Sequence, residues 1–154
     1  SKFVSAAFST DTANKATSPT LLDMTKASIT ALADADEDGF FLMVEGSMID
    51  DGGHDNKAGH TMEEIFDFDR TIGKVLEWAE KDGQTLVIVT GDHATGGMTL
   101  LSGSIDQKRI KVNFSTTGHN GICLPVYAWG PHSEDFVGVY ENTELSDKIR
   151  KLIK

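Results

Sequence analysis

Three apolar runs along the chain have the length and composition of β-strands. They lie at residues 40–44, 85–90 and 124–129. Continuous apolar runs of this length are typical of strands that are buried on both faces of a parallel sheet. Pro125 places the third run at a sheet edge or at the start of a strand. A shorter apolar stretch at residues 3–8 predicts the end of one more strand.

Helical periodicity predicts three helices around these strands. Residues 18–33 carry apolar side chains at steps of three and four, after a Ser-Pro start that suits a helix cap and first turn. Residues 61–81 open with a Thr-x-x-Glu capping box and continue as an apolar stripe up to an Asp-Gly stop. Residues 143–154 are acidic at their start and basic at their end, as the helix dipole favours.

The order of these elements predicts an α/β fold with a mainly parallel sheet flanked by helices. The strand at residue 40, the helix after it and the strand at residue 85 form a unit of normal size for a right-handed crossover. Residues 98–101 and 110–114 predict a hairpin with one solvated face. With 154 residues, 39% hydrophobic and 25% charged, the chain has the composition of one globular unit.

Charge, cysteine content and the length of the apolar runs limit the kinds of partner and site that the chain can have. The net charge is -10 and the sequence pI is about 4.8, and this charge disfavours nucleic acid and anionic membranes as partners. The single cysteine, Cys123, excludes a disulfide within the chain and a zinc site built from cysteines. No apolar run approaches the length of a membrane span, and residues 1–4 do not resemble a signal peptide.

Acidic and histidine side chains follow two of the predicted strands. Glu45, Asp50 and His54 come after the first strand at spacings of five and four, and Asp92 and His93 come after the second. Ligands collect at the carboxyl ends of the strands in α/β sheets. A short helix or turn after the first strand would place Asp50 and His54 on one face. Carboxylate and imidazole ligands suit zinc, and a separate carboxylate suits magnesium.

Each of these motifs also has a simpler explanation. An acidic residue after a strand usually caps a helix or lies in a solvated loop, and one Asp-x-x-x-His segment seldom binds a metal. Two apolar strands that each lead to Asp and His are harder to attribute to capping. His119 lies in a polar loop, residues 115–121, ahead of a strand and not after one. Taken alone, it is a loop histidine.

Three motifs in this order resemble the alkaline phosphatase family. They are Val44-Glu45-Gly46-Ser47 with Asp50 and His54, Val89-Thr90-Gly91-Asp92-His93, and Gly118-His119 with Pro125-Val126-Tyr127-Ala128 and Gly130-Pro131. The resemblance runs from about Pro19 to the end of the chain. It implies an alkaline phosphatase-like α/β fold, of which residues 1–154 would be the C-terminal portion and an incomplete domain. It also implies a periplasmic or secreted protein. Strands that are apolar on both faces need cover above and below, and only about three helices are predicted, so we expect the chain to form a homodimer or to associate with itself.

The resemblance implies a set of metal ligands and an activity. The implied ligands are Asp50, His54 and His119 for a first zinc, Asp92 and His93 for a second zinc, and Glu45 for magnesium. A site with two such metals activates a nucleophile on one ion and stabilises the leaving oxygen on the other. The implied activity is metal-dependent hydrolysis of phosphate monoesters, with inorganic phosphate as product, through a phosphoserine intermediate.

Other parts of the family's machinery have no counterpart in this sequence. The nucleophilic serine, a third ligand of the second zinc, a phosphate-binding arginine and further magnesium ligands come from the family's N-terminal half, so the isolated chain is expected to be inactive. Asp51 stands where members often carry Lys, His or Trp, and Thr95 stands where some carry a histidine behind the metal ligands. Two alternatives remain: a metal-binding fragment without catalysis, and another superfamily member such as a phosphodiesterase.

Overall fold

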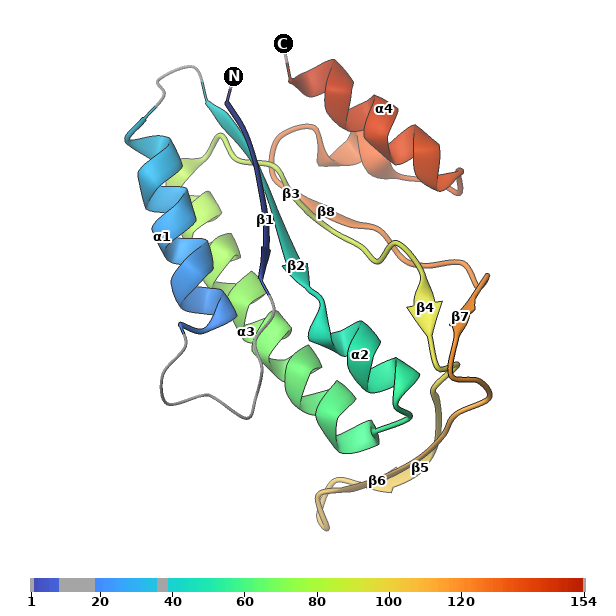
Figure 1. Ribbon diagram of the computed structural model, residues 1–154. Coiled ribbons are helices and arrows are strands. Elements are labelled where there is room, and N and C mark those ends of the chain that lie inside the picture. Colours follow the sequence, from blue (N-terminus) through green and yellow to red (C-terminus); the bar gives the residue numbers. More distant parts are fainter. Residues whose placement is uncertain (1, 9–18, 36–38, 154) are drawn as a thin grey trace.

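The computed structural model describes residues 2–8, 19–35 and 39–153 (Figure 1). The elements in chain order are β1 (Lys2–Phe8), α1 (Leu21–Ala33), β2 (Phe40–Gly46), α2 (Met48–His54), α3 (Ala58–Asp82), β3 (Val87–Val89), β4 (Ala94–Thr95), β5 (Thr99–Ser104), β6 (Arg109–Asn113), β7 (His119–Asn120), β8 (Tyr127–Trp129), the 3-10 helix η2 (Ser133–Phe136) and α4 (Asn142–Leu152). Helices α1 and α3 lie on one side of strands β2 and β3, and α4 lies on the other (Figure 1). Among the described residues, no helix is both long and apolar enough to cross a membrane.

The strands form pairs and not one continuous sheet. The described strands make four two-stranded sheets, β1–β2, β3–β8, β4–β7 and β5–β6. Only β1–β2 is parallel, and the other three pairs are antiparallel. The expected α/β character is present, but the expectation of a mainly parallel sheet is wrong for this part of the chain. The reason is that β2 and β3 do not pair with each other, so that β3 has only β8 as a neighbour.

Helix α1 begins slightly later than the sequence predicts. Its N-cap is Thr20, whose hydroxyl accepts a hydrogen bond from the Asp23 amide at 3.1 Å while the Asp23 carboxylate accepts one from the Thr20 amide at 3.2 Å. This reciprocal pair is a capping box. The predicted cap, Ser18, lies outside the described residues. The buried face of α1 is Leu21, Thr25, Ile29 and Leu32, at steps of four and three, as the apolar pattern predicts.

Helix α3 begins earlier than the sequence predicts. It starts at Ala58, and the hydroxyl of Thr61 donates to the Lys57 carbonyl at 3.1 Å, one turn back. Thr61 is therefore inside the helix, and the capping box predicted at this residue is wrong. The predicted stop is confirmed, because Gly83 adopts a left-handed conformation with φ of 70° at the C-cap.

The strands are less buried than their apolar sequences predict. Every residue of β3 is half-buried, and Met43 of β2 has 48% of its surface exposed. The buried apolar residues of the described part are few: Leu21, Ile29, Leu32, Ala79 and Phe136. The prediction of strands covered on both faces is wrong, because a groove separates β2 from β3 and leaves both strands facing open space.

The predicted hairpin and the predicted last helix are both present. Strands β5 and β6 pair antiparallel and extend away from the body of the molecule, at the bottom of Figure 1. Helix α4 ends at Leu152 and carries Glu144 in its first turn and Arg150 and Lys151 in its last. This charge order agrees with the helix dipole.

Candidate metal centre

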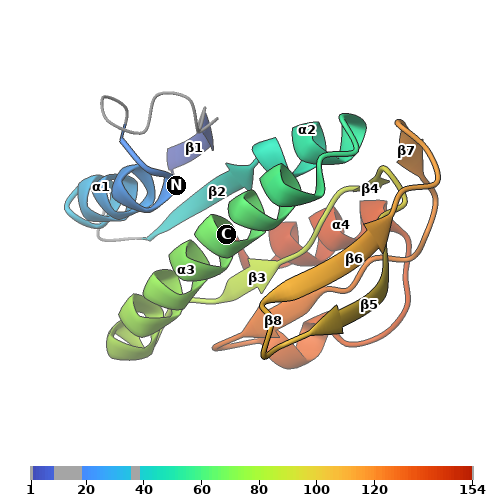
Figure 2. The same cartoon turned by 90° about the horizontal axis from the view of Figure 1, so that it is seen from below.

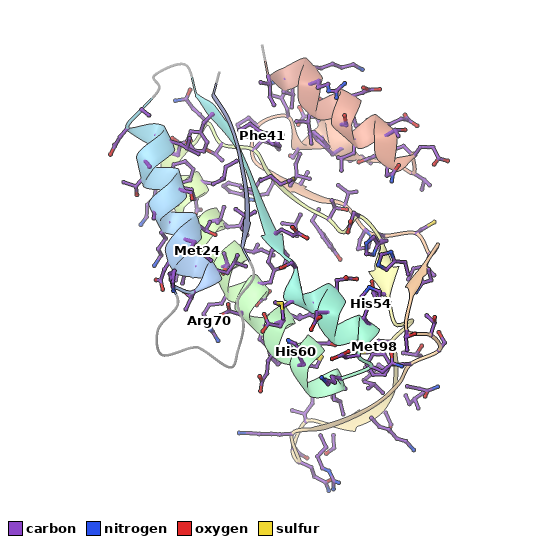
Figure 3. All side chains as sticks on the ribbon, viewed as in Figure 1. Met24, Phe41, His54, His60, Arg70 and Met98 are labelled. Atoms are coloured by element: carbon purple, nitrogen blue, oxygen red, sulfur yellow. The ribbon has the colours of Figure 1, made fainter. Side chains whose placement is uncertain are left out.

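Helix α2 carries the first two site residues. It follows β2 directly and spans Met48–His54, so Asp50 and His54 lie on one face at positions i and i+4, as predicted. Figure 3 shows His54 at the end of α2, beside β4 and β7. The short segment between β2 and α3 therefore folds in the form that the ligand hypothesis requires.

The helical geometry of α2 depends on how closely it packs. Gly52 and Gly53 are both buried, although glycine inside a helix costs about 1 kcal/mol relative to alanine. A Cβ atom at Gly52 would lie 2.6 Å from the Thr61 hydroxyl of α3, and one at Gly53 would lie 3.0 Å from Cβ of Thr95 in β4. Both glycines are thus needed for α2 to fit between α3 and β4.

A two-residue strand brings His119 to the same place. In the β4–β7 pair, Thr95 lies opposite His119 and Ala94 lies opposite Asn120. The amide of Gly96 also donates to the Gly118 carbonyl at 3.1 Å. The prediction that His119 belongs to a loop is therefore wrong: β7 places it across from β4, which follows His93.

The structure gathers Asp50, His54 and His119 into one cluster. The two histidine Nε2 atoms are 3.1 Å apart, His54 Nε2 is 3.3 Å from Asp50 Oδ2, and His119 Nε2 is 3.6 Å from Asp50 Oδ1. One ligand atom from each residue lies within 4.8 Å of the other two. Among the described residues, this is the one group of three or more acidic, histidine or cysteine side chains that is arranged to hold a cation.

The spacing and chemistry of the cluster fit zinc. Zinc binds imidazole nitrogen and carboxylate oxygen at about 2.0–2.2 Å, and tetrahedral geometry then separates neighbouring ligand atoms by about 3.3 Å. The Nδ1–H of His54 is placed to donate to the Thr117 carbonyl, which leaves the Nε2 lone pair free to face the cluster. The side chains of Asp50 and His119 are 41% and 49% exposed, so an external ligand can reach the cluster.

His93 joins this cluster to Asp92. Its Nε2 atom is 3.3 Å from Asp92 Oδ2, and its ring stacks on that of His119 with centroids 3.5 Å apart and an interplanar angle of 19°. The other ring nitrogen, Nδ1, lies 3.9 Å from Asp50 Oδ1. The side chain of Asp92 is 86% exposed. The structure thus places His93 beside the first three residues, and Asp92 contacts the cluster only through His93.

Thr95 contacts both Asp50 of the cluster and His93 of the proposed second site. Its hydroxyl donates a hydrogen bond to Asp50 Oδ1, and its oxygen lies 3.2 Å from His93 Nδ1. A group that hydrogen-bonds a metal ligand fixes its orientation and tunes the site. In the sequence, Thr95 was noticed only because it stands where some family members carry a histidine. No sequence signal indicated the bond to Asp50, since 45 residues separate the two.

Glu45 and Asp51 lie outside the cluster. Glu45 is exposed near the end of β2 and belongs to none of the cation-holding groups found among the described residues. Asp51 Oδ2 is 4.0 Å from Nδ1 of His60, a histidine of α3 that no sequence motif singled out. His60 Nε2 is buried, without a hydrogen bond, 3.8 Å from Glu64 Oε1. His60 therefore lies between α2 and α3, with one ring nitrogen facing Asp51 and the other facing Glu64.

An exposed ion pair follows the end of α2. Lys57 Nζ donates to Asp55 Oδ2 at 2.6 Å. This hydrogen bond, together with the attraction between the charges, lowers the pKa of Asp55 and raises that of Lys57. Both groups are open to solvent, and exposed ion pairs contribute little to stability. This ion pair lies on the surface beside α2 and is not part of the cluster.

Comparison with known proteins matches the chain to one protein family. The family model described as alkaline phosphatase matches residues 7–107 and 102–154. "Alkaline phosphatase 3" of Bacillus subtilis is 31% identical over 88% of this chain and 44% of its own length. The alkaline phosphatase of Escherichia coli K12 is 34% identical over 82% of this chain and 30% of its own length. The chain therefore spans less than half of the length of these relatives.

Solved structures agree with the family match. The alkaline phosphatase of the Antarctic bacterium TAB5 superposes with a TM-score of 0.81 at 46% identity, over 92% of this chain and 42% of that one. A variant of the same enzyme, described with Mg bound in its M3 site, superposes with a TM-score of 0.77 at 47% identity, over 85% of this chain and 40% of that one. With the family model matching nearly its whole length, the chain belongs to the alkaline phosphatase family.

Proposed function

We propose that this chain is the metal-binding part of a phosphate monoester hydrolase of the alkaline phosphatase type. The observation that carries the proposal is the cluster of Asp50, His54 and His119, which combines two imidazoles and a carboxylate within 4.8 Å. Family membership supports the reaction class, because the relatives are named as phosphatases. The cofactors proposed are zinc at this cluster and magnesium near Glu45.

Each residue of the cluster has a distinct task in this proposal. His54 offers Nε2 because Thr117 holds its other nitrogen, and Asp50 is oriented by the Thr95 hydroxyl. His119 supplies the third ligand atom from β7. Bound zinc would supply a Lewis acid that polarises a phosphoryl oxygen. Its fourth position would be open to water or substrate, as in catalytic sites with three protein ligands.

The remaining site residues serve a second cation in this proposal. Asp92 and His93 are adjacent, 3.3 Å apart between Oδ2 and Nε2, and Asp92 is widely exposed. They offer two ligands to a second zinc, whose third ligand would come from outside the described residues. The chain has a net charge of -10, so bound cations are needed to attract an anionic phosphate. The Asp51 carboxylate lies outside the cluster, with Oδ2 4.0 Å from His60 Nδ1.

Family membership also supports a location and an assembly for the whole protein. We place the protein in the periplasm or outside the cell, as a homodimer or a chain that associates with itself. The location rests on the family resemblance, and self-association rests on the apolar strands that the chain leaves partly uncovered. Cell fractionation and sedimentation of the longer protein test them separately.

A chimaera tests the proposed reaction. The matched segment of the TAB5 enzyme is replaced by this chain, which is 46% identical to it. The chimaera is expected to hydrolyse p-nitrophenyl phosphate in preference to bis(p-nitrophenyl) phosphate, and His119→Ala is expected to lower the rate about 100-fold or more. The isolated chain with zinc and magnesium is expected to be no faster than the metals alone, because catalysis also needs a positioned nucleophile. Diester preference, or a rate unchanged by His119→Ala, would contradict the proposal.

A further inference from the structure

Asn120 and Gly121 form the single Asn-Gly pair of the sequence. Asparagine is chemically labile, because the nitrogen of the next backbone amide can attack its side-chain carbonyl carbon, Cγ. Glycine at the next position favours this attack, since it has no side chain to shield the nitrogen and its backbone turns freely. Asn120 is the last residue of β7 and directly follows His119, so a change in its covalent structure would alter the strand that carries a proposed ligand.

The Asn120 side chain is folded toward the amide that would attack it. Its Oδ1 atom accepts a hydrogen bond from the Ile122 amide at 3.3 Å, two residues along the chain. This arrangement is an Asx-turn, in which an asparagine side chain bends over the backbone that follows it. Because Oδ1 is held by the amide just beyond Gly121, Cγ lies beside the Gly121 nitrogen. The folded chain therefore keeps the reacting carbon and nitrogen near each other.

The backbone at Gly121 has room to move. Gly121 is exposed, and a Cβ atom there would have no neighbour within 4 Å. Residues 121–126 belong to no helix or strand, and the Gly121 amide finds no hydrogen-bond acceptor within the described part of the chain. Figures 1 and 2 both show β7 at the periphery of the molecule, beyond β4. Water can thus reach the pair, and the backbone can adopt the conformation that ring closure requires.

Two Asp-Gly pairs, which can close the same ring by loss of water, are restrained by packing. In Asp51-Gly52 the glycine is buried inside α2, and a Cβ atom there would lie 2.6 Å from a side-chain oxygen of α3. In Asp82-Gly83 the Gly83 amide donates to the Ala79 carbonyl at 2.9 Å, at the C-cap of α3. The attacking nitrogen is therefore buried in the first pair and hydrogen-bonded in the second. Neither restraint exists at Asn120.

We propose that Asn120 deamidates spontaneously in the folded chain, faster than any other asparagine. The Gly121 nitrogen forms a bond to Cγ and gives up its proton, while the bond from Cγ to the side-chain nitrogen breaks and ammonia leaves. Water then opens the cyclic succinimide. Breaking the new bond to Cγ leaves aspartate, and breaking the original backbone bond leaves isoaspartate, whose main chain runs through Cγ. The inference needs no metal or substrate, so it does not rest on the proposed function.

Isoaspartate at position 120 would disturb β7. Asn120 lies opposite Ala94 in the β4–β7 pair, which contains only two residues of each strand. An additional methylene group in the main chain at one of these residues changes the spacing of the backbone groups that form the ladder. We therefore expect β7 to separate from β4, which would release His119 from its position opposite Thr95.

Peptide mapping after incubation of the metal-free chain in heavy-oxygen water is the first test. Only deamidation during the incubation introduces the label. The Asn120 peptide is expected to gain label about tenfold faster or more than peptides with Asn56, Asn113 or Asn142, each of which precedes a residue with a side chain. Equal rates at these asparagines, or no label at Asn120, would overturn the proposal.

Comparison with the chain unfolded in guanidinium chloride shows what the fold contributes. Label gain at Asn120 is expected to be at least as fast in the folded chain, because the Asx-turn holds the reacting atoms together. Isoaspartate at Asp82, detected with an isoaspartate methyltransferase, is expected to form about tenfold more slowly in the folded chain, because the Gly83 amide is hydrogen-bonded. Slower label gain at Asn120 in the folded chain than in the unfolded one would overturn the proposal.

Amide exchange in EDTA tests the effect on β7. The Gly96 amide donates to the Gly118 carbonyl at 3.1 Å, next to the β4–β7 pair. In the isolated isoaspartate form, this amide is expected to exchange about tenfold faster or more. Asn120→Asp carries the same charge on a normal main chain and should leave the exchange unchanged. Unchanged exchange in the isoaspartate form, or equal acceleration in Asn120→Asp, would overturn the proposed effect on β7.

Two glycine variants locate the reaction. Gly121→Ala adds a methyl group beside the attacking nitrogen and is expected to slow label gain at Asn120 about tenfold or more. Gly59→Ala adds the same group in α3, where a Cβ atom also has no neighbour within 4 Å, and should leave the rate unchanged. Neither glycine has a positive φ, so both variants should fold. Equal slowing in both variants, or no slowing in Gly121→Ala, would overturn the proposal.

Discussion

Replacing Asp50 with alanine is expected to abolish tight zinc binding by this chain. Asp50 is the central residue of the cluster, since its carboxylate lies 3.3 Å from His54 Nε2 and 3.6 Å from His119 Nε2. It is also the cluster's one anionic group, so its loss leaves two neutral imidazoles around a divalent ion. Removal of groups that merely support a metal ligand typically costs 10–100-fold in affinity. We expect a loss of about 100-fold or more, measured by competition with a chromophoric chelator.

Asp51→Ala is the matched control for this prediction. It removes an adjacent carboxylate from the same helix, but the Asp51 side chain is 55% exposed and is oriented toward His60 of α3. Substitutions of this kind usually change free energies by less than about 0.5 kcal/mol, or about twofold in affinity. An equal loss of zinc affinity in Asp51→Ala and Asp50→Ala would mean that zinc binding depends on the local negative charge and not on Asp50 as a ligand.

Gly96→Ala is expected to be one of the most destabilising single substitutions at the site. Gly96 has φ of +74°, which side chains rarely adopt, and a Cβ atom there would lie 2.6 Å from the Gly53 carbonyl oxygen. The strained conformation costs about 1–3 kcal/mol, and the forced separation of α2 from β4 adds about the same. We expect the free energy of unfolding to fall by about 3 kcal/mol, measured by urea denaturation. Zinc affinity should fall as well, because α2 and β7 carry the proposed ligands.

Gly73→Ala is the control for backbone freedom alone. Gly73 lies in the middle of α3, where a Cβ atom would have no neighbour within 4 Å, and its φ is not positive. Alanine there should raise the free energy of unfolding by about 0.5–1 kcal/mol, because glycine is the poorer helix former. If both alanine variants lost stability equally, close packing around Gly96 would not be the cause.

The sequence alone located most of the cluster because the positions of its residues follow local rules. Asp50 and His54 are four residues apart in a segment that forms a helix, so their common face followed from helical periodicity. Asp92 and His93 follow an apolar run, and the strand-end rule predicted that they lie near the first pair; His93 does so, with Nδ1 3.9 Å from Asp50 Oδ1. These predictions needed no knowledge of long-range packing.

His119 and Thr95 required information that local patterns do not carry. The pairing between them involves two residues in each strand, too short to leave an alternating pattern in the sequence. The prediction of where α3 begins was wrong for a similar reason. Thr61 meets the pattern of a cap, but its contact with Gly52 of α2 and its bond to Lys57 place it inside the helix. Tertiary packing overrode the local signal at both places.

The burial of the strands was predicted wrongly for a physical reason that the structure supplies. Apolar runs at β2 and β3 indicate strands that are suited to cover on both faces. The described residues leave a groove between them, so both remain half-buried. The apolar sequences of β2 and β3 suit strands that are covered on both faces, but residues 2–8, 19–35 and 39–153 do not cover both faces.

Zinc content after exhaustive dialysis tests the central claim most directly. The cluster of Asp50, His54 and His119 supplies three protein ligands, whereas Asp92 and His93 supply two. The chain should retain about one zinc, and X-ray absorption at the zinc edge should show two imidazoles with oxygen ligands at about 2.0–2.2 Å. Retention of no zinc, retention of two, or a zinc that persists in the His54→Ala, His119→Ala double variant would contradict the account.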